Sequence, residues 1–225
     1  MTRLGRRFRT VLTVFTATGA LAGAALTGAA PAGAAESATD IAPGVEYTQL
    51  DIPAAKGVAH AHVLDVDLRN PHVRVDLLYP GAVASREPVS ELAGSRGAVA
   101  GVNGDFFNIT ETQHPGVEAT GASVGPAIAQ GRVLKAAVPD GQRFGPALPS
   151  GTSTKDVFGV GTDRLARLDG LALDGSVRTP EGQLPLGGLN QYALPVGSVG
   201  AFTSDWGSAS RVRSTCGTDT DRAAP

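Results

Sequence analysis

The densest group of chemically capable side chains lies in residues 101–116, GVNGDFFNITETQHPG. This stretch follows an apolar run and contains carboxylates, amides, a histidine and two adjacent phenylalanines. A carboxylate paired with a histidine or a second carboxylate can supply a general acid and base for hydrolysis. Amide groups provide the donors and acceptors that sugar hydroxyls need. The alternative interpretation is an elaborate turn with no chemistry.

Asp105 and Glu111 are the candidate catalytic carboxylates of this stretch. The candidate substrate-binding residues are small, polar or aromatic: Asn103, Gly104, Phe107, Asn108 and His114. Asn103-Gly104 predicts a sharp turn, because glycine accepts a positive φ. The two phenylalanines are expected to divide, with one ring in the core and the other beneath a ligand. The sequence predicts neither a metal site nor a cofactor.

Two other motifs suggest different chemistry. Residues 121–125, GASVG, match the G-x-S-x-G elbow that would make Ser123 the nucleophile of a serine hydrolase. An elbow needs a helix after the serine, whereas Pro126 follows closely here, so turn-forming glycines are the simpler interpretation. His60 and His62 share one face of a predicted strand, a spacing that metal sites use. Two polar residues on a solvent-facing strand explain that pair more simply.

The elements that must position these residues are short strands and one helix. A strand at 45–52 precedes an antiparallel hairpin predicted between 58–68 and 72–79. A helix is predicted over 87–95, with Ser85 as its N-cap and Gly97 just past its end, and it leads into a fully buried strand at 98–102. Further strands are predicted at 123–129, 132–137, 157–161, 165–168, 171–173, 189–192 and 199–203. The pattern predicts an α+β fold with mostly short antiparallel or mixed strands and few helices.

Residues 1–35 have the features of an export signal. Four arginines precede an apolar segment of small residues, and Ala32-Gly33-Ala34 fits the rule for signal-peptide cleavage. The Sec pathway is the predicted route, and Arg6-Arg7 leaves the twin-arginine pathway as an alternative. We therefore expect a secreted protein with a signal at 1–35, a linker at 36–44, a domain at 45–215 and a tail at 216–225.

The charge balance bears on the partners of the exported part. The chain has 19 basic and 21 acidic residues, and removal of the four signal arginines leaves a net charge of −6. Nucleic-acid binding needs clustered lysine and arginine, which the sequence does not show. After the signal, no run is long and apolar enough to span a bilayer. Nucleic acid and a membrane span are therefore not expected, and a carbohydrate or phosphoglycan is the expected partner.

The single cysteine, Cys216, is unusual for an exported protein. It lies in the polar ending CGTDTDRAAP, which shows no signal for the end of a packed element. Two interpretations remain open. Cys216 is either a free thiol on a tail or one half of a disulfide whose partner belongs to a later segment.

Residues 90–107, SELAGSRGAVAGVNGDFF, resemble the signature of the phosphodiester glycosidase family. That signature is a short helix followed by a strand of the form (A/G)-(V/I)-N-G-x-(F/Y)-F, which residues 100–107 fit. Later segments are also similar to the family: IAQGRV at 128–133, FGV at 158–160 and AFTSDWG at 201–207. The resemblance extends over about residues 45–210.

The resemblance implies hydrolysis of a sugar–phosphodiester bond, in a pocket lined by Asn103 and its neighbours. Family members continue into a second half with an arginine and an Asp-Gly-Gly-Gly-Ser loop, which this sequence does not contain. The resemblance therefore implies a domain truncated at its C-terminus. A non-catalytic exported glycan-binding domain is the alternative, and a serine hydrolase using Ser123 is the third hypothesis.

Overall fold

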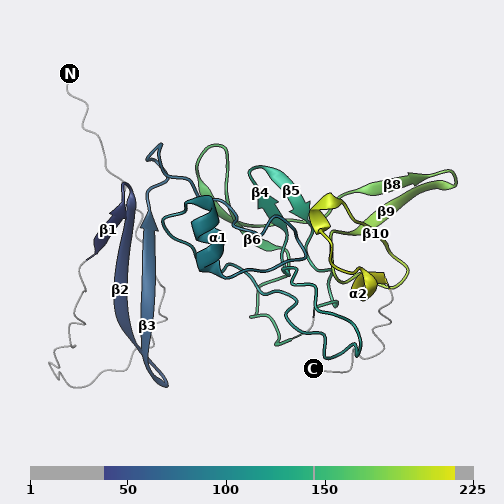
Figure 1. Cartoon of the computed structure of the whole chain (residues 1–225), viewed down its shortest axis with the longest axis horizontal. Helices are drawn as coiled ribbons and strands as arrows, with labels where there is room; N and C mark the ends of the chain where they lie inside the picture. Colours follow the sequence, from purple (N-terminus) through teal and green to yellow (C-terminus); the bar gives the residue numbers. More distant parts are fainter. Residues whose placement is uncertain (1–37, 144, 216–225) are drawn as a thin grey trace, which may run out of the picture.

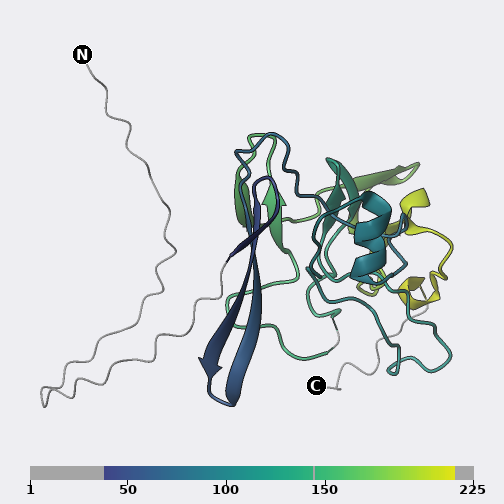
Figure 2. The same cartoon turned by 60° about the vertical axis from the view of Figure 1, so that its left-hand side comes forward.

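The structure is a computed structural model that describes residues 38–143 and 145–215 (Figures 1 and 2). Its strands form small, mostly antiparallel sheets, and its few helices are short. This agrees with the predicted mixed class at the level of a mostly β chain with few helices. The predicted signal, the tail and Cys216 lie outside the described residues. No helix in the described part of the chain is long and apolar enough to cross a membrane.

The first sheet is a ribbon at one side of the molecule (Figure 1). It contains β1 (Thr39–Ala42), β2 (Val45–Ala54) and β3 (Gly57–Val66) in that order, with antiparallel pairing throughout. The predicted linker at 36–44 is therefore wrong at residues 39–42, which pair with β2. The predicted hairpin between 58–68 and 72–79 is also wrong, because β3 pairs with the strand before it and 72–79 forms no strand.

A long-range arginine explains the conformation of the chain after β3. Arg164 Nε donates to the carbonyl of Leu68 at 2.6 Å, and Arg164 Nη2 donates to the carbonyls of Asn70 and Val73 at 2.7 and 2.9 Å. These carbonyls are thereby satisfied by a side chain and not by a neighbouring strand. The alternating pattern of residues 72–79 contained no sign of this competitor.

Helix α1 (Val89–Arg96) lies close to the predicted position. It begins after Pro88 without a side-chain cap, so the predicted N-cap Ser85 is wrong. It ends as predicted at Gly97, whose φ of 62° is left-handed. The buried strand predicted at 98–102 is wrong, since these residues form no strand and Val102 is 79% exposed.

Three hairpins follow. β4 (Ala127–Ala129) and β5 (Arg132–Lys135) confirm the predicted hairpin, and its turn residues Gln130 and Gly131 have φ of 51° and 74°. The other strands are β6 (Asp156–Val160) with β7 (Ala166–Gly170), and β8 (Ser176–Thr179) with β9 (Gly182–Leu189). β10 (Val199–Ala201) pairs in parallel with β9. The strand predicted at 171–173 is absent, and the one at 189–192 ends at Leu189.

The hydrophobic core surrounds Trp206, which is fully buried in the 3-10 helix η1 (Ser204–Trp206). The cluster has ten buried members: Val83, Ala84, Ala122, Val124, Ala129, Leu134, Val138, Tyr192, Ala193 and Trp206. Phe202 packs edge-on against Trp206 with ring centroids 5.1 Å apart. The amide of Ala84 donates to the carbonyl of Trp206 at 3.1 Å. The core therefore joins the segment before α1 to η1. The last described helix is α2 (Val212–Thr215), whose Arg213 binds Glu111.

Candidate functional site

The predicted site is an irregular strand-like segment held beside residues 121–125. Phe107 and Ser123 form an isolated antiparallel bridge. The amide of Asn108 donates to the carbonyl of Ala122, and the amide of Val124 donates to the carbonyl of Phe106, both at 2.8 Å. These bonds fix the backbone from 106 to 108 against buried core residues. The site is therefore a loop without a regular strand, and backbone hydrogen bonds to residues 122–124 hold it in place.

Asp105 is exposed and is oriented by two backbone amides. Its Oδ1 accepts from the amide of Phe106 at 2.7 Å, and its Oδ2 accepts from the amide of Gly125 at 2.5 Å. A Cβ placed on Gly125 would come within 3.0 Å of Asp105 Oδ2, so glycine permits this close approach. Amide donors suit the ionised carboxylate. The side chain is thus positioned and still accessible.

Lys135 of β5 lies behind Asp105 and is almost completely buried. Its Nζ donates to the carbonyls of Gly125 at 2.5 Å and Ala136 at 2.8 Å. Burial lowers the pKa of Lys135 to about 7, and the nearby charge of Asp105 opposes this effect. Asp105 and Lys135 therefore both bind the backbone of Gly125, Asp105 at its amide and Lys135 at its carbonyl.

Glu111 is the centre of a buried polar network, and only 3% of its side chain is exposed. Arg213 Nε of α2 donates to Glu111 Oε1 at 2.8 Å, and Asn108 Nδ2 donates to the same oxygen at 2.5 Å. His114 Nδ1 lies 2.7 Å from Glu111 Oε2 and is assigned as the donor, because the carboxylate can only accept. Both oxygens of Glu111 are thus occupied.

Asn108 connects this network to the core side of the loop. Its Oδ1 accepts from the amide and the hydroxyl of Thr120, at 2.6 and 2.9 Å. Its Nδ2 also donates to the carbonyl of Thr110. The side chain is buried and fully used in holding the loop. Asn108 and Glu111 therefore have a positioning geometry.

Tyr192 is a buried member of the core cluster, and the charges of the candidate site act on its hydroxyl. Burial raises the pKa of Tyr192 to about 12, and the charges of Asp105 and Glu111 act in the same direction. The positive charges of Arg213 and Arg143 oppose this shift. Tyr192, Arg143 and Arg213 were not identified as site residues from the sequence, because they lie outside residues 101–116.

Phe106 and Phe107 are both exposed, by 65% and 40% respectively. The prediction that one ring enters the core is therefore wrong. The guanidinium of Arg143 lies over the Phe106 ring at 5.2 Å, and that of Arg86 lies over the Phe107 ring at 6.0 Å. Each aromatic ring of the loop thus has a cationic neighbour.

Asn103 and Gly104 are exposed at the tip of the loop. Gly104 is not among the residues with positive φ, and a Cβ placed on it would meet nothing within 4 Å. The conformational reason proposed for this glycine is therefore wrong in this structure. Both residues remain accessible, whereas Asn108, Glu111 and most of His114 are covered.

A cavity of about 340 Å³ adjoins the loop. Its lining is rich in polar side chains and small residues: Asp140, Gly141, Arg143, Gly145, Ala147, Leu148, Thr152, Ser153 and Thr154. Arg143 connects it to the Phe106 ring, and the carbonyl of Thr154 would lie 3.7 Å from a Cβ placed on Gly125. The predicted site therefore borders this cavity without lining it.

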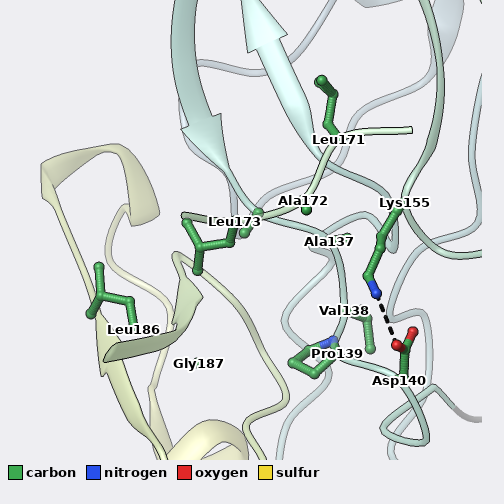
Figure 3. A pocket seen from close by; sticks show the side chains of 11 residues that line it. Ala137, Val138, Pro139, Asp140, Lys155, Leu171, Ala172, Leu173, Leu186 and Gly187 are labelled. Atoms are coloured by element: carbon green, nitrogen blue, oxygen red, sulfur yellow. Dashed lines mark hydrogen bonds and ion pairs between the residues drawn. The ribbon is translucent and has the colours of Figure 1, made fainter. Parts of the chain in front are cut away.

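A second cavity, of about 240 Å³, lies farther along the chain (Figure 3). It is more apolar and is lined by Leu171, Leu173, Leu186 and their neighbours, with the Lys155–Asp140 ion pair at its side. Lys155 Nζ lies 2.8 Å from Asp140 Oδ2. None of the predicted site residues lines this cavity, so it is separate from the candidate site.

The remaining motifs do not assemble into sites. Ser123 pairs with Phe107, and strand β4 follows it where an elbow would have a helix. His60 lies 2.5 Å from Asp51 on the opposite strand, and His62 lies 2.5 Å from the Tyr47 hydroxyl. Across residues 38–143 and 145–215, no three His, Cys, Asp or Glu side chains are placed to hold a metal ion.

Comparison of the chain with models of protein families, with curated protein sequences and with solved structures found no match. Among the residues that carry the geometry of the loop and of the cavity beside it, Arg86, Lys135, Arg143 and Arg213 were not found from the sequence. Their only sequence signal is their charge, and they lie far from residues 101–116.

Proposed function

We propose that the protein is an exported hydrolase that cleaves the bond between a sugar and a phosphodiester. The observation that carries the proposal is the polar cavity beside a loop with exposed aromatic rings, arginines and an accessible carboxylate. Aromatic rings pack against the apolar faces of sugars, and arginine matches the geometry of phosphate oxygens. The family resemblance of residues 90–107 supports the same substrate class.

The two candidate carboxylates have different roles in this proposal. Asp105 is exposed and held by two amides, so it is the group that contacts the substrate and acts as acid or base. Glu111 is buried with both oxygens bound, so it is a positioning residue that holds His114 and the loop against α2. Asn103, Gly104 and Phe107 are the accessible residues proposed to contact the sugar.

Arg143 and Arg86 are the proposed phosphate ligands. Arg143 lines the polar cavity and lies over Phe106, while Arg86 lies over Phe107. The rings remain 65% and 40% exposed beside these guanidinium groups, so a sugar can reach them. A sugar-1-phosphodiester would place its sugar on a ring and its charged group beside an arginine.

The test is release of free sugar from an N-acetylglucosamine-1-phosphodiester by the purified full chain. We expect Asp105→Asn to reduce kcat by at least about 100-fold, because it removes an acid or base. It should lower the melting temperature only slightly, since one of the two backbone amides that bind Asp105 loses its acceptor. Asp169→Asn is the matched control, since the Asp169 carboxylate also accepts from the amide that follows it. Glu111→Gln is expected to lower the melting temperature together with activity. Full activity of Asp105→Asn would contradict the assignment.

A non-catalytic glycan-binding domain is the second candidate, and the complete occupation of Glu111 favours it. A carboxylate with both oxygens bound in a buried network is a poor acid or base. This function predicts binding of the same phosphodiester without sugar release by the wild-type chain. Phe107→Ala should weaken that binding, whereas Phe158→Ala, which removes another exposed ring, should not.

A further inference from the structure

The outer edge of β3 is open. In the sheet order β1-β2-β3, strand β3 is at the end, and no described strand pairs with its far side. Both views show the ribbon at one side of the molecule (Figures 1 and 2). Ten consecutive positions of β3 pair with β2 on the near side. The far side therefore presents a long row of backbone donors and acceptors in strand geometry.

β3 has none of the features by which proteins block an open edge. Its sequence, GVAHAHVLDV, contains no proline, lysine or arginine. Its only carboxylate is Asp65, near one end. Exposed edge strands are normally protected by such residues or by a bulge, and the β2–β3 register runs without a shift. An unprotected edge of this length fits a strand partner.

The two faces of the ribbon differ. The pairing places Leu50, Ile52, Ala59, Ala61 and Val63 on one face, and Ile52 and Val63 are 48% and 41% exposed. The other face carries the polar pairs Asp51–His60 and Tyr47–His62. A partner strand must therefore bring apolar residues to the first face and must place no carboxylate opposite Asp65.

A second copy of β3 meets both conditions in one register. When the strand is paired antiparallel with itself about Ala61, Ala59 lies opposite Val63 of the copy and Val58 lies opposite its Leu64. His60 then lies opposite His62, and Asp65 lies opposite Gly57, so no two carboxylates meet. Every residue stays on its own face, because positions related in this way differ by an even number.

We propose that two copies of this chain associate through β3, antiparallel about Ala61, into one continuous six-stranded sheet. The two-fold symmetry makes the interface self-complementary, as closed dimers require. The partners contribute backbone hydrogen bonds along the edge and apolar contacts between Ala59 and Val63. This interface lies away from the polar cavity and does not depend on the proposed function.

The test is sedimentation velocity of the purified full chain over a concentration series. The wild type is expected to approach twice the monomer mass as concentration rises. Ala59→Lys/Val63→Lys places lysine opposite lysine in both symmetric pairs and should abolish the dimer. Ala59→Lys/Val63→Glu changes the same positions but places lysine opposite glutamate, so the dimer should persist. Ile41→Lys, on the opposite edge strand β1, is the control and should leave the mass unchanged.

Two results would overturn the proposal. A wild-type chain that stays monomeric at its highest soluble concentration excludes the second copy as the partner of this edge. Equal loss of association in the Lys/Lys and Lys/Glu variants excludes the register about Ala61. Circular dichroism of each variant separates loss of the dimer from loss of the ribbon, because a folded ribbon retains its strand signal.

Discussion

At the scale of single residues, Lys135 is an almost completely buried lysine, and its burial affects stability. Its ammonium group is buried among backbone carbonyls, and burial lowers its pKa from 10.5 to about 7. Between these two pH values the unfolded chain binds more protons at this site than the folded chain. The free energy of unfolding therefore rises with pH across this window. Above pH 10, the raised pKa of Tyr192 acts in the opposite direction, because the unfolded chain then loses its tyrosine proton first.

We predict that the melting temperature of the wild type increases from pH 7 to pH 9.5. The contribution of Lys135 reaches at most about 1.4 kcal/mol per pH unit. Lys135→Met removes the titrating group and should flatten this part of the profile. Lys155→Met changes a half-exposed lysine and should leave the rise intact. Thermal melts in buffers of equal ionic strength measure the difference, and parallel profiles for wild type and Lys135→Met would contradict the prediction.

At the scale of elements, two turns use non-glycine residues with left-handed backbones. Gln130 has a φ of 51° in the β4–β5 turn, and Arg164 has a φ of 62° between β6 and β7. The Gln130 amide donates to Asp76 Oδ1, an interaction that glycine would keep. The Arg164 side chain instead holds three backbone carbonyls of the chain after β3. Side-chain hydrogen bonds therefore compensate for the left-handed backbone at Arg164. At Gln130 the hydrogen bond to Asp76 involves the backbone amide.

Glycine should consequently have opposite effects at these two positions. We expect Gln130→Gly to raise the free energy of unfolding by about 0.5–1 kcal/mol, because it relieves a left-handed conformation. Arg164→Gly relieves the same strain but removes the side-chain donor of the Leu68 and Val73 carbonyls, so it should lower stability by about 2 kcal/mol or more. The Asn70 carbonyl keeps the amide of Val73 as a donor. Urea denaturation of both variants beside the wild type measures the two changes. Two changes of the same sign would refute the argument.

Local chemistry explains which elements were predictable from the sequence. The Gln130-Gly131 hairpin and the end of α1 at Gly97 depend on residues within a few positions, and both predictions were confirmed. The predicted turn before 72–79 is instead held by Arg164, far along the chain, which binds the carbonyls of Leu68, Asn70 and Val73. In the candidate site, the sequence predicted both Asp105 and Glu111 but not that Asp105 is exposed and Glu111 buried. The buried Glu111 is paired with Arg213, which lies 102 positions away in the sequence.

At the scale of the whole molecule, the ribbon of β1, β2 and β3 buries less apolar surface than the core around Trp206. The buried cluster contains no residue of β1, β2 or β3. Residues 51–60 are all exposed, although the β2–β3 pairing is continuous. Elements with few buried apolar contacts open without global unfolding. The ribbon is therefore the part of the described chain that should open first.

Hydrogen exchange measures this difference directly. We predict that amides of residues 46–65 exchange faster than those of 134–138 and with a weaker dependence on denaturant, because their opening exposes little surface. Trp206 is the single tryptophan and is fully buried, so its fluorescence reports the global transition. The measurement should be made at low protein concentration, where the ribbon edge is unpaired. Equal exchange of both regions, at the rate set by the fluorescence transition, would show one cooperative unit.

The backbone contact between the segment before α1 and η1 also fixes the order in which the molecule can be assembled. The amide of Val83 donates to the carbonyl of Asp205 at 2.7 Å. A chain growing on the ribosome cannot close this contact until η1 has emerged. Long sequence separation between contacting residues slows folding. The core therefore remains unassembled until residue 206 has been synthesised, and its indole stays exposed to water until then.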